Sequence, residues 1–194
     1  MKKLLLLVSI VTFGFSNSYA QDIKFGVKAG GNIATLTGDV EDLKSKFSFH
    51  IGGVAEIPIT DKLSFQPELL YSSQGAEYDE GFDFGGISAN SKINLDYINV
   101  PLMAKYYVIE NLGVEFGPLV GFLISAEEDY DGETVDVKDD LKSIDFGLAA
   151  GASYELDFGL NFGLRYNLGL ADISDGSDDK LHNGVLQVSV GYFF

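Results

Sequence analysis

The chain ends in Val185-Leu186-Gln187-Val188-Ser189-Val190-Gly191-Tyr192-Phe193-Phe194, a stretch in which apolar residues alternate with small or polar ones. A period of two residues sends successive side chains to opposite faces, and it predicts a β-strand. One face of this strand carries Val188, Val190, Tyr192 and Phe194. An apolar and aromatic face opposite a polar one is the pattern of a strand in a closed membrane sheet.

The other end of the chain predicts export. Two lysines precede an apolar run at residues 4–15, and small residues lead up to Ala20. This order is typical of a signal peptide over residues 1–20, cleaved after Ala20, which leaves a single domain over residues 21–194. The alternative is a membrane anchor. A helix that spans the bilayer needs about 20 apolar residues, and the run at residues 4–15 is too short for that.

The amino-acid composition of the chain excludes several kinds of site and partner. The chain has no cysteine, which excludes a lipoprotein anchor, disulfides and thiolate metal sites. Its formal net charge is -16, and loss of Lys2 and Lys3 with the leader makes it -18. A nucleic-acid partner requires a basic surface, so this charge predicts none. No later segment is apolar enough for a spanning helix, so any membrane crossing must use strands.

Eight runs with a period of two follow the leader, and most exceed the ~5–6 residues of a typical soluble strand. Short connections at residues 59–62, 109–111 and 155–158 alternate with long polar ones at 36–46, 76–91, 126–143 and 171–181. This alternation predicts an all-β, eight-stranded antiparallel up-and-down transmembrane β-barrel with short periplasmic turns and long extracellular loops. The predicted strands cover residues 23–35, 47–58, 63–75, 92–108, 112–125, 144–154, 159–170 and 182–194.

The two faces of these runs indicate which side meets lipid. Leu160, Phe162 and Leu164 share a bulky face, whereas Asn161 and Gly163 lie on the other. A bulky, continuous apolar face suits lipid, and small or polar residues suit a narrow interior. In water, the apolar face would be a patch far larger than the few hundred Å² that monomers tolerate.

The same alternation predicts the contents of the lumen. An eight-stranded barrel has an interior just wide enough for side chains to fill it. Charged residues that are buried there should be paired, because a lone buried charge costs several kcal/mol. We therefore expect a structural polar network that plugs the lumen; a selectivity filter in an open pore is the alternative. The predicted inward residues are Lys28, His50, Glu56, Gln66, Glu68, Lys105, Glu115, Arg165 and Gln187; the network consists of the six charged ones.

The long connections are acidic, and they carry 19 of the 29 Asp and Glu residues. Glu127, Asp129, Asp131 and Gly132 imitate the start of a calcium loop, but Lys138 occupies the place of its bidentate glutamate. We therefore predict no metal site, and interpret these acids as a solvated surface that gathers divalent cations weakly.

No catalytic group is evident. The two histidines are His50, inside a predicted strand, and His182, which with Asp178 or Asp179 could imitate a His–Asp pair. No glycine-rich loop lies between a strand and a helix, where it could bind phosphate. We predict a protein that is not an enzyme and has no cofactor.

The whole pattern resembles the PorT-like porin family of Bacteroidetes, a family of small outer-membrane β-barrel domain proteins. The resemblance covers nearly all of residues 21–194, and it implies an eight-stranded barrel in a Gram-negative cell envelope but no particular activity. The motifs that carry it are Lys24-Phe25-Gly26-Val27-Lys28-Ala29-Gly30, Ala55-Glu56-Ile57-Pro58, Ser64-Phe65-Gln66-Pro67-Glu68-Leu69-Leu70-Tyr71, Asn99-Val100-Pro101-Leu102-Met103-Ala104-Lys105-Tyr106-Tyr107, Gly113-Val114-Glu115-Phe116-Gly117-Pro118 and Arg165-Tyr166-Asn167-Leu168-Gly169-Leu170.

The leading hypothesis is a non-enzymatic integral outer-membrane protein with a structural or surface-interaction role. Its expected partners are outer-membrane lipid, lipopolysaccharide, the barrel assembly machinery and an extracellular or envelope protein of unknown identity. The assembly machinery would recognise the terminal pattern of Val188, Val190, Tyr192 and Phe194. The alternative function is a narrow porin-like channel for small cationic solutes. Two further alternatives are a loop-based enzyme that uses His182 and a soluble lipid-binding barrel.

Overall fold

The computed structural model describes residues 23–39, 43–78, 91–130, 133–176 and 180–194. The predicted signal peptide and the start of the domain at residues 21–22 lie outside these described residues. Apart from one short 3-10 turn, η1, the described elements are strands. They are β1(Lys24–Gly38), β2(Leu43–Thr60), β3(Leu63–Tyr78), β4(Ser91–Ile109), β5(Leu112–Tyr130), β6(Glu133–Asp136), η1(Lys138–Asp140), β7(Ile144–Glu155), β8(Leu160–Gly169) and β9(Leu181–Phe193).

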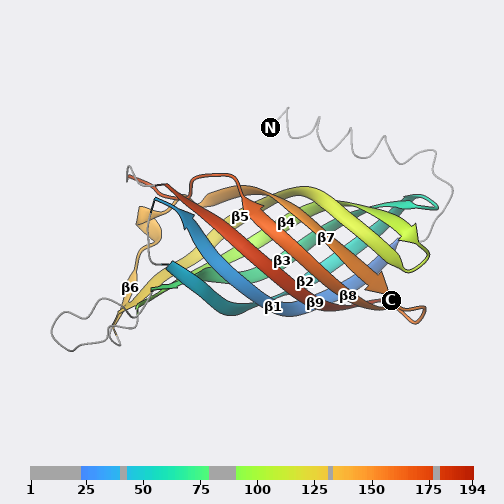
Figure 1. Cartoon of the computed structure of the whole chain (residues 1–194), viewed down its shortest axis with the longest axis horizontal. Helices are drawn as coiled ribbons and strands as arrows, with labels where there is room; N and C mark the ends of the chain where they lie inside the picture. The colour runs from blue at the N-terminus through green and yellow to red at the C-terminus, as the bar shows by residue number, and fades with distance from the viewer. Residues whose placement is uncertain (1–22, 40–42, 79–90, 131–132, 177–179) are drawn as a thin grey trace, which may run out of the picture.

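Eight of these strands form a closed antiparallel barrel, which confirms the predicted fold (Figure 1). Each strand pairs with its neighbour in the chain, except that β5 pairs with β7 along the wall. Pairing of β1 with β9 closes the sheet, from Gly26 opposite Phe193 to Gly38 opposite Leu181. The extra strand β6 pairs only with the last residues of β5 and extends one end of the barrel.

The two ends of the barrel differ. The tight turns after β2, β4 and β7 lie at one end, which we call the turn end, together with Phe194. The longer connections and β6 lie at the opposite end, which we call the loop end (Figure 1). Gly159 in the β7–β8 turn has φ +93°, and a Cβ there would lie 2.3 Å from the backbone oxygen of Phe193. This turn therefore requires glycine.

At the loop end, several strands run further than the alternation predicted. β1 continues to Gly38, and β5 continues to Tyr130, inside a segment predicted as loop. β4 and β5 stay paired up to Ser91 opposite Tyr130. A continued ladder satisfies backbone N–H and C=O groups that a loop would leave to water. The wall therefore reaches beyond the predicted strands.

Along most of the barrel, large apolar side chains point outward and small or polar ones inward. Phe116, Leu164 and Val188 are each more than half exposed, whereas Arg165 and Gln187 are buried. Exposed aromatic residues include Phe25, Phe49, Tyr106, Phe122, Phe146, Tyr154, Tyr166, Tyr192 and Phe194. This outer surface has the apolar and aromatic character of a lipid-facing wall.

This arrangement reverses near the loop end. On β4 the outward positions are apolar from Val108 back to Ile98 but polar from Asp96 to Lys92, while Leu95 is fully buried. The change coincides with a register shift between β4 and β5 at Asp96. Residues 98–108 number eleven, which matches the ~9–11 residues of a tilted membrane strand. On the loop-end side, the seven residues 91–97 of β4 extend about 23 Å along the strand beyond that band.

Candidate functional site in the barrel lumen

Four charged side chains meet in the middle of the lumen, and all four are buried. Lys28 Nζ lies 2.8 Å from Glu68 Oε1. Arg165 donates to both carboxylate oxygens of Glu68, at 2.8 and 2.7 Å, and its Nη2 also donates to Glu115 Oε2 at 2.5 Å. Such bidentate pairs combine charge with fixed geometry. The structure therefore brings four of the six predicted network residues into one cluster, which we call the central cluster.

The central cluster crosses the full width of the barrel. Its residues come from β1, β3, β5 and β8, which are every second strand around the wall. β3 and β8 stand opposite each other in this order, so the Glu68–Arg165 pair bridges opposite walls. Two positive and two negative charges balance. The burial cost of these ions is offset only because each one has a partner in bonding distance.

A second charged layer lies closer to the turn end and holds the other two predicted residues. Lys105 Nζ contacts Glu56 Oε2 at 2.9 Å and Glu155 Oε2 at 3.7 Å. Glu56 Oε1 also accepts hydrogen bonds from Tyr107 Oη at 2.5 Å and Ser64 Oγ at 3.0 Å. Lys105 and Glu56 are nearly inaccessible to solvent. The two charged layers therefore fill the lumen with paired ions.

Lys105 and Glu115 lie directly opposite each other in register, but their side chains do not bond to each other. The stem of Lys105 runs over Gly113, where an added Cβ would lie 2.8 Å from Lys105 Cε. Gly113 thus leaves room for the lysine to reach Glu56. Lys105 therefore belongs to the second charged layer, whereas Glu115, its neighbour in register, belongs to the central cluster.

An uncharged layer follows on the loop-end side of the central cluster. His50 Nδ1 lies 2.7 Å from Asn32 Oδ1, and His50 Nε2 lies 3.1 Å from Ser189 Oγ. Gln187 donates to the same Asn32 oxygen at 3.0 Å, and Asn32 Nδ2 donates to Ser72 Oγ at 3.1 Å. Both histidine nitrogens therefore have buried partners, and this geometry gives His50 a packing role.

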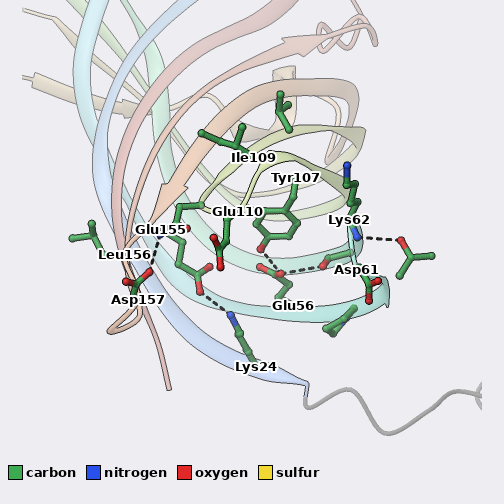
Figure 2. A pocket seen from close by; sticks show the side chains of 15 residues that line it. Lys24, Glu56, Asp61, Lys62, Tyr107, Ile109, Glu110, Glu155, Leu156 and Asp157 are labelled. Atoms are coloured by element: carbon green, nitrogen blue, oxygen red, sulfur yellow. Dashed lines mark hydrogen bonds and ion pairs between the residues drawn. The ribbon is translucent and has the colours of Figure 1, made fainter.

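A cavity of about 580 Å³ opens at the turn end (Figure 2). The turns after β2, β4 and β7 surround it, and Glu56, Tyr107 and Glu155 lie along its wall. Lys24 reaches Glu155 Oε1 at 2.8 Å across this space. The cavity leads inward to the second charged layer, so it is a vestibule that ends at buried ion pairs.

The loop end is closed by apolar side chains that the sequence analysis did not predict. Ile173, in the connection after β8, is fully buried and packs with Leu36, Leu95 and Leu123 from the barrel wall. Val137, Leu141 and other partly buried side chains pack around them. We call this group the apolar cap. In the sequence, Val137, Leu141 and Ile173 stand as isolated apolar residues in connections that are otherwise polar.

Asp172 anchors the connection that carries Ile173. Its carboxylate lies 3.0 Å from Lys142 Nζ and accepts backbone N–H groups of Leu181 and Ser174, both at 3.1 Å. The hydrogen bond from Lys142, together with the two backbone donors, lowers the pKa of Asp172 to about 2. The charged form of Asp172 therefore holds the cap segment in place.

Of the four terminal residues singled out for assembly, three lie on the outer face of β9 and the fourth is Phe194, the residue that follows it. Val188, Val190, Tyr192 and Phe194 are exposed, and the N–H of Phe194 donates to the carbonyl of Phe25 at 2.9 Å. Phe193 points the other way, is buried, and places its ring 5.6 Å from Lys105 Nζ. Phe193 therefore faces the lumen, whereas Phe194 lies on the outer face of the wall.

The other candidate residues do not form a reactive site. His182 Nδ1 lies 2.8 Å from the carbonyl of Ala171, while residues 178 and 179 lie outside the described residues. In the calcium-like segment, Asp129 accepts hydrogen bonds from Thr134 and Asn94, and residues 131 and 132 are not described. Within the described part of the chain, no three His, Cys, Asp or Glu side chains are grouped to hold a metal ion.

Sequence reasoning missed several residues of these layers and of the apolar cap, among them Asn32, Glu155, Tyr107 and Ile173. Glu155 was assigned to a turn, although it ends β7 and faces Lys105 and Lys24. Tyr107 follows the inward parity of Lys105 and could have been found from it. Ile173 could not, because it belongs to no strand. Among the residues described, no helix is long and apolar enough to cross a bilayer.

Comparison with known proteins identifies the family of this chain and structures with a similar fold. The family described as outer membrane protein beta-barrel domain matches residues 16–175. No curated protein matches the chain in sequence. Among solved structures, Neisserial surface protein A is 18% identical with a TM-score of 0.57, and Ail, the attachment invasion locus protein of Yersinia pestis, is 13% identical with a TM-score of 0.53. In both comparisons 90% of this chain and 100% of the other are covered.

A major outer membrane protein of Thermus thermophilus gives a TM-score of 0.50 at 15% identity, over 90% of this chain and 100% of that one. At such identities these likenesses support the fold alone. The family match carries more weight, since it covers well over half of the sequence. The chain belongs to the family of outer membrane proteins with a β-barrel domain, and is an integral protein of the outer membrane.

Proposed function

We propose that this protein is a non-enzymatic barrel with a sealed lumen, which serves the structure of the envelope or presents its extracellular end to a partner. The observation that carries this proposal is the Glu68–Arg165 pair, which bridges opposite walls at 2.7 and 2.8 Å. Lys28 bonds to the carboxylate of that pair, and Glu115 bonds to its guanidinium. An ion would have to break several buried bonds to pass this level.

The loop end, which we place on the extracellular side of the membrane, supports the same conclusion. The apolar cap covers the lumen with Ile173, which has no exposed surface. An aqueous pathway would have to cross this apolar layer and then the central cluster. Apolar constrictions exclude water from pores. The two levels close the lumen independently, so loss of one alone should not open a wide channel.

Conductance across a planar bilayer tests the sealed lumen. We expect no stable openings from the unmodified protein. Ion current is expected from a variant that loses both charged layers and the cap, with Lys28, Glu56, Glu68, Lys105, Glu115 and Arg165 changed to alanine together with Ile173→Ala. A matched control changes the outward residues Val188 and Leu164 to alanine and should stay closed. Wide, stable openings of the unmodified protein would contradict the proposal. A small cation-selective current would favour the alternative, a narrow channel for small cationic solutes.

We further propose that the chain is exported by a signal peptide at residues 1–20, cleaved after Ala20, and that the barrel assembly machinery recognises the outer face of β9. The support is the orientation of Val188, Val190, Tyr192 and Phe194, which leaves all four side chains on the outer surface. The sequence motifs favour the PorT-like family of Bacteroidetes as the finer assignment. Lipopolysaccharide is then the expected lipid at the extracellular rim, with an envelope or extracellular protein as a further partner.

Deletion of Phe194 tests this assembly role. We expect less protein at the cell surface and more degradation in the periplasm, because the outer face loses its last aromatic residue. Phe193→Ala is the matched control, since it changes an inward aromatic residue next to Phe194. Assembly is measured as the fraction of protein that migrates as folded barrel on an unboiled gel. Equal folded fractions in the unmodified and truncated proteins would argue against the proposal.

A further inference from the structure

The extracellular end contains a second cavity, separate from the vestibule, with a volume of about 190 Å³. Seven aliphatic side chains line it, contributed by the walls of β1, β4 and β9 and by the connections before and after η1 and after β8. Leu36, Leu95 and Ile173 are its buried residues, and Leu141 is half-buried. This cavity lies inside the apolar cap, on the aqueous side of the lipid-facing band.

Two carboxylates also line this cavity. Glu128 is half-buried on β5, and Asp140 is exposed at the end of η1. None of the described residues that line the cavity is basic. An apolar chamber with a few polar groups at defined positions is the usual form of a small-molecule site. Here the polar groups are both anionic.

We propose that this cavity binds a small organic cation with an apolar body, such as an alkylammonium or a single-ring arylammonium. Size supports this class, since an apolar cavity of about 150 Å³ in another protein holds one benzene molecule. The aliphatic lining would surround the apolar body, and the ammonium group would face Asp140 at the rim. An anion of the same shape would meet repulsion from the Asp140 carboxylate.

This inference does not depend on whether the lumen conducts. The cavity lies above the uncharged layer, and a ligand could enter and leave it from the extracellular side. A failure to bind would leave the sealed lumen unaffected, and an open pore would leave the cavity lining unchanged. The two proposals therefore have separate tests.

Titration followed by methyl NMR tests the proposal on the full mature protein in lipid nanodiscs, because detergent tails would compete for an apolar cavity. The probes are benzylammonium, benzyl alcohol and benzoate. We expect saturable shifts of the Ile173, Leu36 and Leu141 methyls with benzylammonium, weaker binding of benzyl alcohol, and the weakest binding of benzoate. The outward methyls of Val188 report partition into lipid, which does not saturate.

Variants separate the cavity from general charge attraction. Leu141→Phe fills the cavity from its rim and should abolish saturable binding of benzylammonium. If Leu141→Phe lowers the folded fraction on an unboiled gel, Val137→Phe serves as the second cavity-filling variant. Asp140→Asn should weaken benzylammonium binding about two- to fivefold, the range for a partly exposed ion pair. Asp139→Asn, one residue away and outside the lining, should leave binding unchanged.

Three results would overturn the proposal. The first is an absence of saturation at the cavity methyls. The second is binding that survives in both rim variants. The third is benzoate binding as strong as that of benzylammonium, which would remove the assigned charge preference.

Discussion

The middle of the lumen and its extracellular end both hold buried side chains, but of opposite kinds. In the middle, Arg165 and Glu68 are paired charges inside an apolar outer wall. At the extracellular end, Leu95 and Ile173 form an apolar interior, and the outer wall carries Lys92 and other polar residues. The same strands build both regions, so the strand itself does not decide which chemistry faces inward.

The solvent around the wall decides it. In the bilayer the outer surface must be apolar, which leaves polar side chains for the narrow interior, where they have to pair. Beyond the bilayer the outer surface meets water, and the hydrophobic effect drives apolar side chains inward, as in a soluble protein. The polarity of β4 changes between Ile98 and Asp96. This step marks the outer edge of the lipid-facing band.

The largest expected effect comes from breaking the central cluster. Arg165→Ala leaves Glu68 with Lys28 as its one cationic partner and Glu115 without its arginine, so buried charges lose their compensation. Removing one member of a buried ion pair typically costs roughly 3–5 kcal/mol. We expect unfolding in urea at a correspondingly lower concentration, measured in lipid vesicles by tyrosine fluorescence.

Arg165→Lys is the matched variant for this prediction. It keeps the charge but cannot form the two parallel bonds to Glu68, so its loss of stability should be intermediate. If Arg165→Ala unfolded within about 1 kcal/mol of the unmodified protein, the cluster would be no more important than a surface ion pair.

A smaller and more local effect is expected at the extracellular end. Ile173→Ala removes a fully buried side chain from the apolar cap, and such changes cost roughly 2–5 kcal/mol. Because the cap lies outside the lipid-facing band, the opening should stay local. Hydrogen exchange should accelerate at Leu181 and Lys142, whose N–H groups bond within this region.

The barrel below should keep its protection in this variant, including the amide of Phe194, which bonds to Phe25 at the opposite end. Val188→Ala, on the outer face, provides a substitution that should not speed exchange in the cap. Global loss of protection in Ile173→Ala would show that the two regions are not independent.

The smallest effect concerns pH. Asp172 has a pKa of about 2, below its ordinary value, so its contribution to stability is full above pH ~4 and is lost as pH falls through about 2. We expect hydrogen exchange at Ser174 and Leu181 to rise over that interval while the barrel stays folded. Lys142→Ala should move the change to higher pH. Lys138→Ala is the control, since Lys138 bonds to the carbonyl of Ile124.

An onset of exchange at the same pH in the Lys142→Ala and unmodified proteins would show that Lys142 does not set the pKa of Asp172. In that case the backbone donors alone would hold the carboxylate, and the cap would depend on the fold of its own segment.

Much of the barrel could be predicted because a period of two is a local property. The alternation in residues 159–170 indicated which side chains face outward, and the spacing of short and long connections indicated the topology. Partners across the lumen were harder to predict. Lys105 and Glu115 are neighbours in register, yet Lys105 bonds to Glu56 because its stem runs over Gly113 toward the turn end.

The reversal of polarity on β4 also has a signal in the local sequence, but its meaning becomes clear only once the inward and outward faces are known from the structure. Tyr97 and Ile98 are adjacent apolar residues, and this pair interrupts the alternation where the inward face changes character. Ile173 had no periodic signal at all. Its burial depends on residues from β1, β4 and β5, which meet only after the barrel has closed.

The sequence alone determined most of the strand positions, the face that meets lipid and six of the inward charges, because alternation follows directly from strand geometry. Tertiary structure decided which charges pair, how Glu68 and Arg165 span opposite walls, and how a polar connection brings Ile173 over the lumen. Those outcomes depend on side-chain reach and on strands far apart in the chain. No local pattern encodes the distances that closure of the barrel sets.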